Sequence, residues 1–179
     1  GETFYFSKPK ILEFLFSYRK GWLLYSPIFI LSFLGLFNMY KTNNPWLFST
    51  VIIFPITIYL FASWWCWWFG GGFGMRPMID YYPLLIIPIG HILSLNFPYK
   101  KTILTAVLLS FTSLNLFQTL QKRKGVIHWD SMTKEAYWEF FFTPKMNTSS
   151  DWDKQKNILK TPNYDKARKG EKEYNFRIL

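Results

Sequence analysis

The sequence predicts an all-α integral membrane protein with about four transmembrane helices, an interfacial helix before them and a polar C-terminal tail after them. Half of the 179 residues are hydrophobic, 22% are aromatic, and no Asp, Glu, Lys or Arg lies between Lys41 and Arg76. Residues 1–120 carry eight Lys or Arg and three Asp or Glu, whereas residues 121–179 carry thirteen and eight. The mean hydropathy of +0.03 therefore averages a hydrophobic body and a basic tail.

Residues 1–20 are predicted to form an amphipathic helix in the membrane interface. After Pro9, apolar residues recur at roughly helical spacing; they are Ile11, Leu12, Leu15 and Phe16. Cations flank them, namely Lys8, Lys10, Arg19 and Lys20. A helix of this composition lies flat at a lipid surface. The end of a preceding loop explains the same residues equally well.

Residues 21–121 are predicted to be the membrane body, because they contain four apolar stretches: 21–40, 46–68, 81–97 and 102–121. A stretch of about 20 apolar residues matches the hydrocarbon thickness of a bilayer. Pro27 lies near the start of the first stretch, and Pro55 is expected to kink the second. The third stretch is short and contains Pro83 and Pro88. Polar residues in the fourth indicate packing against other helices.

Residues 122–179 form the basic polar tail. Ser131 indicates a helix start, and residues 136–142 continue that helix with an aromatic face. Because exposed aromatic rings favour aggregation, we expect residues 126–142 to dock on the membrane body through Trp129, Tyr137, Trp138 and Phe141. Beyond about residue 150 the tail is polar and Lys-rich, and we expect it to be loosely ordered.

The net charge of +10 and the single cysteine narrow the possible partners. Nucleic acid is not expected as a partner, because half of the chain is too apolar to stay in water. Membrane lipid with anionic headgroups, or a phosphorylated lipid substrate, fits the charge better. Cys66 alone predicts neither a disulfide nor a metal cluster, and no cofactor is expected. The chain opens on Gly1 without a signal peptide, and we expect it to be the C-terminal piece of a larger membrane protein.

The stretch 63–83, SWWCWWFGGGFGMRPMIDYYP, contains the strongest candidate site. Trp rings gather where a membrane helix reaches the interface, and the glycine run ends that helix. Arg76 then lies in a surface turn, with Asp80 one helical turn further on. The two residues form a structural ion pair, or Arg76 binds a phosphate with help from glycine N–H groups. The glycines placed to help are Gly71, Gly72 and Gly74. Both interpretations stay open, and they are compatible.

Other titratable residues offer no catalytic constellation. Glu13 lies in the first segment, and His91 lies in an apolar run where a hydrogen-bonded packing role is expected. His128 and Asp130 lie together at the base of the tail, but two histidines far apart do not predict a metal site. The sequence has no Ser/His/Asp order, Walker loop or zinc-protease motif, and GGGFG lacks the context of a dinucleotide fingerprint. No catalytic residue is assigned.

Two stretches together resemble a known enzyme group. RKGWLLYSPIFILSFLGLF at 19–37 is similar to a span with R-x-G-L, Y-S-P and L-G-L in bacterial polyprenol-phosphate-dependent glycosyltransferases. WWFGGGFGMRPMIDYYPLL at 67–85 is similar to their later W-W-G-G and F-G-x-R turn. These multi-spanning GT-C-type enzymes are relatives of protein mannosyltransferases and lipid A aminoarabinose transferases. The resemblance covers roughly residues 19–97. HWDSMTKEAYW in the tail also resembles a segment of uncharacterised Bacteroidetes membrane proteins of this type.

The resemblance implies transfer of a sugar from a polyprenol-phosphate donor to an acceptor at the outer face of the bacterial inner membrane. In such enzymes the catalytic carboxylate lies in the first external loop, and residues 1–45 contain no match to that acidic motif. The chain would then lack the general base. Arg76 and Asp80 would be its donor-phosphate or loop-ordering groups, while the triple glycine departs from the family pattern.

The alternative hypothesis is a non-enzymatic membrane scaffold or subunit of a transport or assembly complex, in which Arg76 and Asp80 are structural. In either case the N-terminal segment, the Arg76 turn and the tail should share one side of the membrane. Lys41 and residues 100–101 should lie on the other side. The Lys and Arg distribution makes the first side cytoplasmic, whereas the resemblance places it outside. We follow the resemblance.

Overall fold

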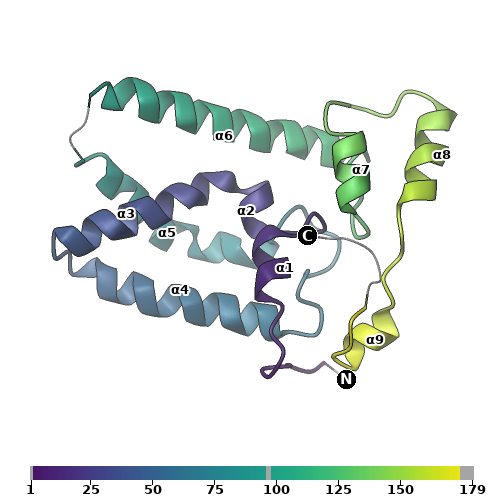
Figure 1. The fold of residues 1–179 in the computed structure, drawn as a ribbon, viewed down its shortest axis with the longest axis horizontal. Coiled ribbons are helices and arrows are strands. Elements are labelled where there is room, and N and C mark those ends of the chain that lie inside the picture. Colours follow the sequence, from purple (N-terminus) through teal and green to yellow (C-terminus); the bar gives the residue numbers. More distant parts are fainter. Residues whose placement is uncertain (1, 96–97, 174–179) are drawn as a thin grey trace.

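All the regular secondary structure of the described chain is helical (Figure 1). The computed structural model describes residues 2–95 and 98–173. Within those ranges no β-strand forms, and one isolated antiparallel bridge joins Phe4 to Trp64. The predicted all-α class is confirmed.

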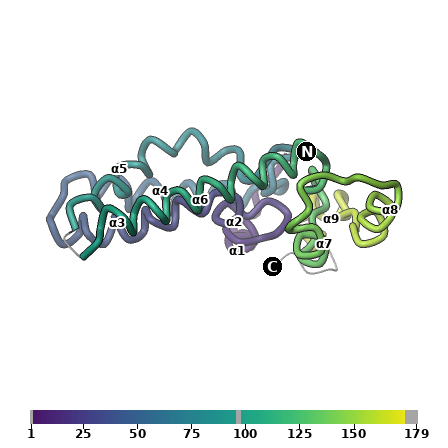
Figure 2. The backbone as a smooth tube through the Cα atoms, turned by 90° about the horizontal axis from the view of Figure 1, so that it is seen from above, coloured from purple at the N-terminus to yellow at the C-terminus, as the bar shows by residue number. Residues whose placement is uncertain are grey.

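Four helices run lengthwise in an elongated bundle (Figures 1 and 2): α3 (Ile30–Lys41), α4 (Trp46–Ser63), α5 (Tyr82–Ile92) and α6 (Lys100–Arg123). Helix α3 packs on α4 and α5, whereas α6 lies apart from them and contacts the chain mainly at residues 27–29. Gly35 allows α3 and α5 to approach closely. A Cβ atom at Gly35 would lie 1.8 Å from the carbonyl oxygen of Pro88, so a larger side chain would force the helices apart. Ser32 Oγ donates a hydrogen bond of 3.0 Å to the carbonyl oxygen of Leu85 in the same interface.

Two helices, α4 and α6, are long and apolar enough to cross a membrane. They indicate a membrane protein, and they are fewer than the four or so spans predicted. The stretch 21–40 is broken at Ser26, whose backbone leaves the helical conformation at φ −140° and ψ 60°. A residue before proline disfavours the α conformation, and Pro27 follows. The stretch therefore splits into three helices: α2 (Trp22–Tyr25), the 3₁₀ helix η1 (Pro27–Phe29) and α3.

The other predicted boundaries also change. The stretch 81–97 forms only the 11-residue helix α5, which ends at Ile92, and residues 96–97 lie outside the described residues. The stretch 46–68 is helical only to Ser63, so the Trp cluster after it lies in a turn. The predicted interfacial helix of residues 1–20 is reduced to the six residues of α1 (Ile11–Phe16).

One end of the bundle carries a cap, which we define as α1, the loop 64–81 and the tail helices α7 (Lys134–Glu139), α8 (Ser149–Ile158) and α9 (Tyr164–Arg168). The turn after Lys41 and the start of α6 lie at the opposite end (Figures 1 and 2). The N-terminal segment, the Arg76 turn and the tail therefore share one end of the bundle, while their shared side of the membrane stays a prediction.

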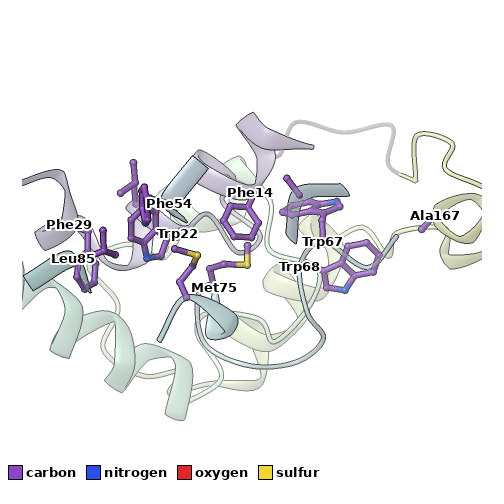
Figure 3. Packing of buried hydrophobic residues seen from close by; sticks show 12 residues of the cluster. Phe14, Trp22, Phe29, Phe54, Trp67, Trp68, Met75, Leu85 and Ala167 are labelled. Atoms are coloured by element: carbon purple, nitrogen blue, oxygen red, sulfur yellow. The ribbon is translucent and has the colours of Figure 1, made fainter. Parts of the chain in front are cut away.

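The main hydrophobic core lies where the cap meets the bundle (Figure 3). Trp22 and Phe54 from the bundle, Trp67 and Trp68 from the loop, and Ala167 from the tail belong to one buried cluster. Ring centroids of Trp67 and Trp68 are 5.8 Å apart in an edge-to-face arrangement. Because this cluster draws on segments that are distant in sequence, it holds the tail against the membrane body.

Docking of the tail is confirmed, and of the four predicted residues Tyr137 and Phe141 are the more deeply packed. Tyr137 is buried and Phe141 half-buried, whereas Trp129 and Trp138 are 53% and 55% exposed. The expectation of loose order beyond residue 150 is wrong for the described chain up to residue 173. Helix α8 begins with a capping box between Thr148 and Asp151, and buried positions occur in each tail segment: Gln155, Ala167 and Glu173.

We expect the expressed chain to fractionate with membranes and to require detergent for extraction. Only 6% of the apolar window of α6 is buried, so its side chains need a nonaqueous environment. Ultracentrifugation of a cell lysate, followed by alkaline and detergent washes of the pellet, measures this directly. A monodisperse protein recovered in detergent-free buffer would overturn the membrane assignment.

Candidate functional site

The cap is organised around Arg19, which lies just before α2. Its Nε donates to the carbonyl oxygen of Asp130 at 2.7 Å, and its Nη2 donates to Oδ1 of the same residue at 2.8 Å. The two side chains are 1% and 2% exposed. The guanidinium carbon lies 3.7 Å from the ring centroid of Trp68, a cation–π contact. Arg19 thus connects the membrane body, the Trp loop and the tail.

A second carboxylate completes this buried network. Glu173 Oε1 accepts a hydrogen bond of 2.9 Å from Trp67 Nε1 and lies 3.8 Å from Nη1 of Arg19. Its other oxygen lies 3.9 Å from Nζ of Lys10. Tyr164 donates its hydroxyl to Oδ2 of Asp130. Burial and that hydrogen bond raise the pKa of Tyr164 to about 12. Arg19 and Lys10 balance the charges of Asp130 and Glu173, so the network supports the fold, while Nη1 of Arg19 makes no hydrogen bond.

Lys20 connects the same network to the glycine turn. Its Nζ donates to the carbonyl oxygen of Gly72, and the residue is 2% exposed. Burial lowers the pKa of Lys20 to about 7, and repulsion from Lys122 acts in the same direction, while Asp130 opposes them. The hydrogen bond fixes the turn at Gly72 from its buried side.

His128 shapes the turn that presents Asp130. Its Nδ1 accepts hydrogen bonds from the backbone N–H groups of Asp130 and Ser131, at 3.2 and 2.9 Å. Burial lowers the pKa of His128, although Asp130 raises it in part. The neutral imidazole therefore carries its proton on Nε2.

Arg76 and Asp80 lie at the opposite, exposed side of the loop. The 3₁₀ helix η2 (Arg76–Tyr81) provides the helical turn that the sequence predicted, but no ion pair joins the two exposed side chains in the described structure. The prediction of a structural ion pair between Arg76 and Asp80 is therefore wrong. Both residues line an open hollow of about 430 Å³ together with Phe69, Pro77 and Ile79. An i,i+4 ion pair needs the spacing of an α-helix, and the tighter 3₁₀ turn does not provide it.

The candidate glycines have different surroundings. Gly72 lies beside Arg76, whose Cβ and Cδ would be 3.6 Å from an added Cβ atom. Gly71 lies under the Trp129 ring, at 3.2 Å by the same measure. Gly74 is buried with φ +55°, and an added Cβ atom would lie 3.0 Å from Cβ of Tyr25. Gly72 is thus the glycine that the structure brings next to the Arg76 side chain.

The remaining sequence candidates lie apart from the Arg76 hollow. Glu13 lies in α1 and Cys66 in the Trp turn, both half-buried. His91 Nε2 lies 2.8 Å from Nδ2 of Asn44, in agreement with the predicted packing role. Among the described residues no group of three or more His, Cys, Asp or Glu side chains could hold a metal ion.

Sequence reasoning missed the residues of the buried network. Asp130 and His128 were noticed only as neighbours, and Arg19 and Lys20 only as interfacial cations. The signal that could have found them is the R-K-G start of an apolar stretch, because two cations at such a position require carboxylate or carbonyl partners. Nothing local identifies those partners, since Asp130 lies 111 residues from Arg19 in the sequence.

Comparisons with family models, curated proteins and solved structures find no match to this chain. The geometry of the cap is therefore the basis for a functional proposal.

Burial of Lys20 predicts a rise in stability with pH. The unfolded chain, in which the pKa of Lys20 is near 10.5, binds more protons than the folded chain between about pH 7 and that value. The free energy of unfolding should rise from about pH 7 upward, by at most about 1.4 kcal/mol per pH unit. Below about pH 7 the cost of the buried charge is complete and constant.

Thermal unfolding in detergent micelles from about pH 6 to about pH 9 measures this rise. Lys20→Met should flatten the profile, and the exposed Lys124→Met is the matched control. An equal rise in Lys20→Met would contradict the assignment.

Proposed function

We propose that the chain is the C-terminal membrane portion of a glycosyltransferase-like protein. Arg76 would bind the phosphate of a polyprenol-phosphate sugar donor at the outer face of the bacterial inner membrane. The observation that carries the proposal is an exposed Arg76 with no carboxylate partner among the described residues, in a hollow with apolar walls. A guanidinium in such a position seeks an anion, and its planar fork matches phosphate oxygens.

The position of the hollow suits a lipid-linked anion. It lies in the loop between α4 and α5, where the apolar helix α4 has just ended. Phe69, Pro77 and Ile79 can contact an isoprenoid chain while Arg76 holds its phosphate. Gly72 brings its backbone close to the Arg76 side chain, and Lys20 holds the carbonyl oxygen of that glycine. This arrangement supports donor binding, whereas the general base would come from outside the chain.

The scaffold hypothesis remains the second candidate because of α6. This helix is 6% buried over its apolar window and exposes hydroxyl-bearing residues along its length: Thr105, Ser110, Thr112, Ser113 and Thr119. Hydroxyl groups on membrane helices favour contacts with other helices over contacts with lipid. A partner subunit against α6 would account for them without any enzymatic role.

Arg76 variants separate these candidates. Arg76→Ala should weaken binding of a short-chain polyprenyl phosphate by about tenfold or more, because charge-assisted hydrogen bonds are lost. The affinity of Arg76→Lys should lie between those of the wild type and Arg76→Ala, since Lys keeps the charge but not the planar fork. Asp80→Asn should leave binding intact or strengthen it by removing a negative charge. Titration of the purified chain in detergent, with the unphosphorylated polyprenol as a ligand control, measures each affinity.

Arg123→Ala provides the matched protein control, because Arg123 is exposed at the same end of the bundle. An equal loss of affinity in Arg76→Ala and Arg123→Ala would show that the effect comes from the overall positive charge at this end of the bundle and not from a site at Arg76. Unchanged binding in Arg76→Ala would end the donor-site proposal and favour the scaffold.

A further inference from the structure

A separate hollow of about 390 Å³ is lined by residues of α8. This helix lies at the outer edge of the cap (Figure 1). The hollow lies between that helix and the turn that contains His128 and Ser131, and it shares no lining residue with the Arg76 hollow. Its volume falls in the range of about 300–1,000 Å³ that is usual for small-molecule sites. None of the functions considered above uses it.

Trp152 supplies a flat aromatic wall for this hollow. The residue is 47% exposed, and one edge of its indole packs against Gly125. A Cβ atom at Gly125 would lie 2.6 Å from Cη2 of Trp152, so only glycine permits the ring to sit there. The indole is thus held at one edge, while much of its surface remains available to a ligand.

Gln155 supplies an oriented hydrogen-bond acceptor. It is 3% exposed, and its Nε2 donates to the carbonyl oxygens of Gly125 and Val126 at 3.1 and 2.7 Å. These hydrogen bonds fix the carboxamide, and no described residue donates to its Oε1. The buried side-chain atoms without a hydrogen-bond partner do not include this Oε1, so the atom reaches solvent and can accept from a ligand hydroxyl group.

The other polar groups balance in charge and in hydrogen-bonding type. Asp153 and Lys156 line the hollow, and neither forms an ion pair or hydrogen bond with the residues that the structure describes. His128 can offer only Nε2, since its Nδ1 accepts two backbone hydrogen bonds. Ser131 and Thr161 add hydroxyl groups to one acid, one base, an amide oxygen and an imidazole donor, and such a lining has no strong preference for an anion or a cation.

We propose that this hollow binds a neutral carbohydrate. A sugar ring presents an apolar C–H face that stacks on an indole, and its rim of hydroxyl groups both donates and accepts hydrogen bonds. Trp152 matches the apolar face, while Gln155, Asp153 and Lys156 match the hydroxyl groups. The site is independent of Arg76 and stands whether or not the chain binds a lipid-linked phosphate.

The test uses the purified chain in a detergent without a sugar headgroup. Methyl glycosides of neutral hexoses and N-acetylhexosamines, and neutral disaccharides, are titrated by ligand-observed NMR. We expect saturable binding of at least one of them, weakened about tenfold or more by Trp152→Ala, the loss typical of a central Trp in a binding site. Asp153→Asn should weaken the same binding several-fold, and because Asp153 is exposed and without a described partner this variant keeps the fold.

Two controls isolate the site. Trp46→Ala removes a comparably exposed Trp, at 57%, from the opposite end of the bundle and should leave the affinity unchanged. Arg76→Ala should also leave it unchanged, which separates this proposal from the donor site. Absence of saturable binding by every neutral sugar, binding of charged sugars only, or equal affinity in wild type, Trp152→Ala and Asp153→Asn would overturn the proposal.

Discussion

The pairing of Arg19 with Asp130 is the interaction on which the cap depends. Both side chains are almost completely buried, and a buried charge is tolerated only when it is paired and hydrogen-bonded. Here the backbone and carboxylate of Asp130, the ring of Trp68 and the hydroxyl of Tyr164 surround the two charges. Because these groups come from distant segments, the cap can close over the bundle only as a unit.

The network explains why the two sides of the 64–81 loop differ. On the buried side, Lys20 holds the carbonyl oxygen of Gly72, and Trp67 donates to Glu173. On the exposed side, Arg76 extends from the same loop without a described carboxylate partner. The buried cations support the fold, and the exposed one is available to a ligand. A rigid loop supported by the network would hold Arg76 in place before a ligand arrives. Less conformational entropy would then be lost on binding.

Local signals were enough to predict the all-α class, α4, α6 and the Arg76 turn. These signals are the length of an apolar stretch and a run of glycines that ends a helix. The stretch 21–40 was mistaken for one span because composition outweighed the backbone restriction that Pro27 places on Ser26. The ordered structure of the tail was not predicted, because its sequence is mostly polar and only a few residues, such as Ala167, are buried. The network at Arg19 joins residues 111 positions apart, and no local pattern encodes that contact.

Hydrogen–deuterium exchange in the Asp130→Asn variant tests most directly whether the Arg19 network holds the cap together. If the network holds the cap, amides of α9 and of the loop 64–81 should lose protection together, while those in the middle of α4 stay protected. Asp165→Asn, which removes only an exposed contact with Arg168, should leave both regions protected. Unchanged protection of α9 and the Trp loop in Asp130→Asn would contradict the central role of the buried pair.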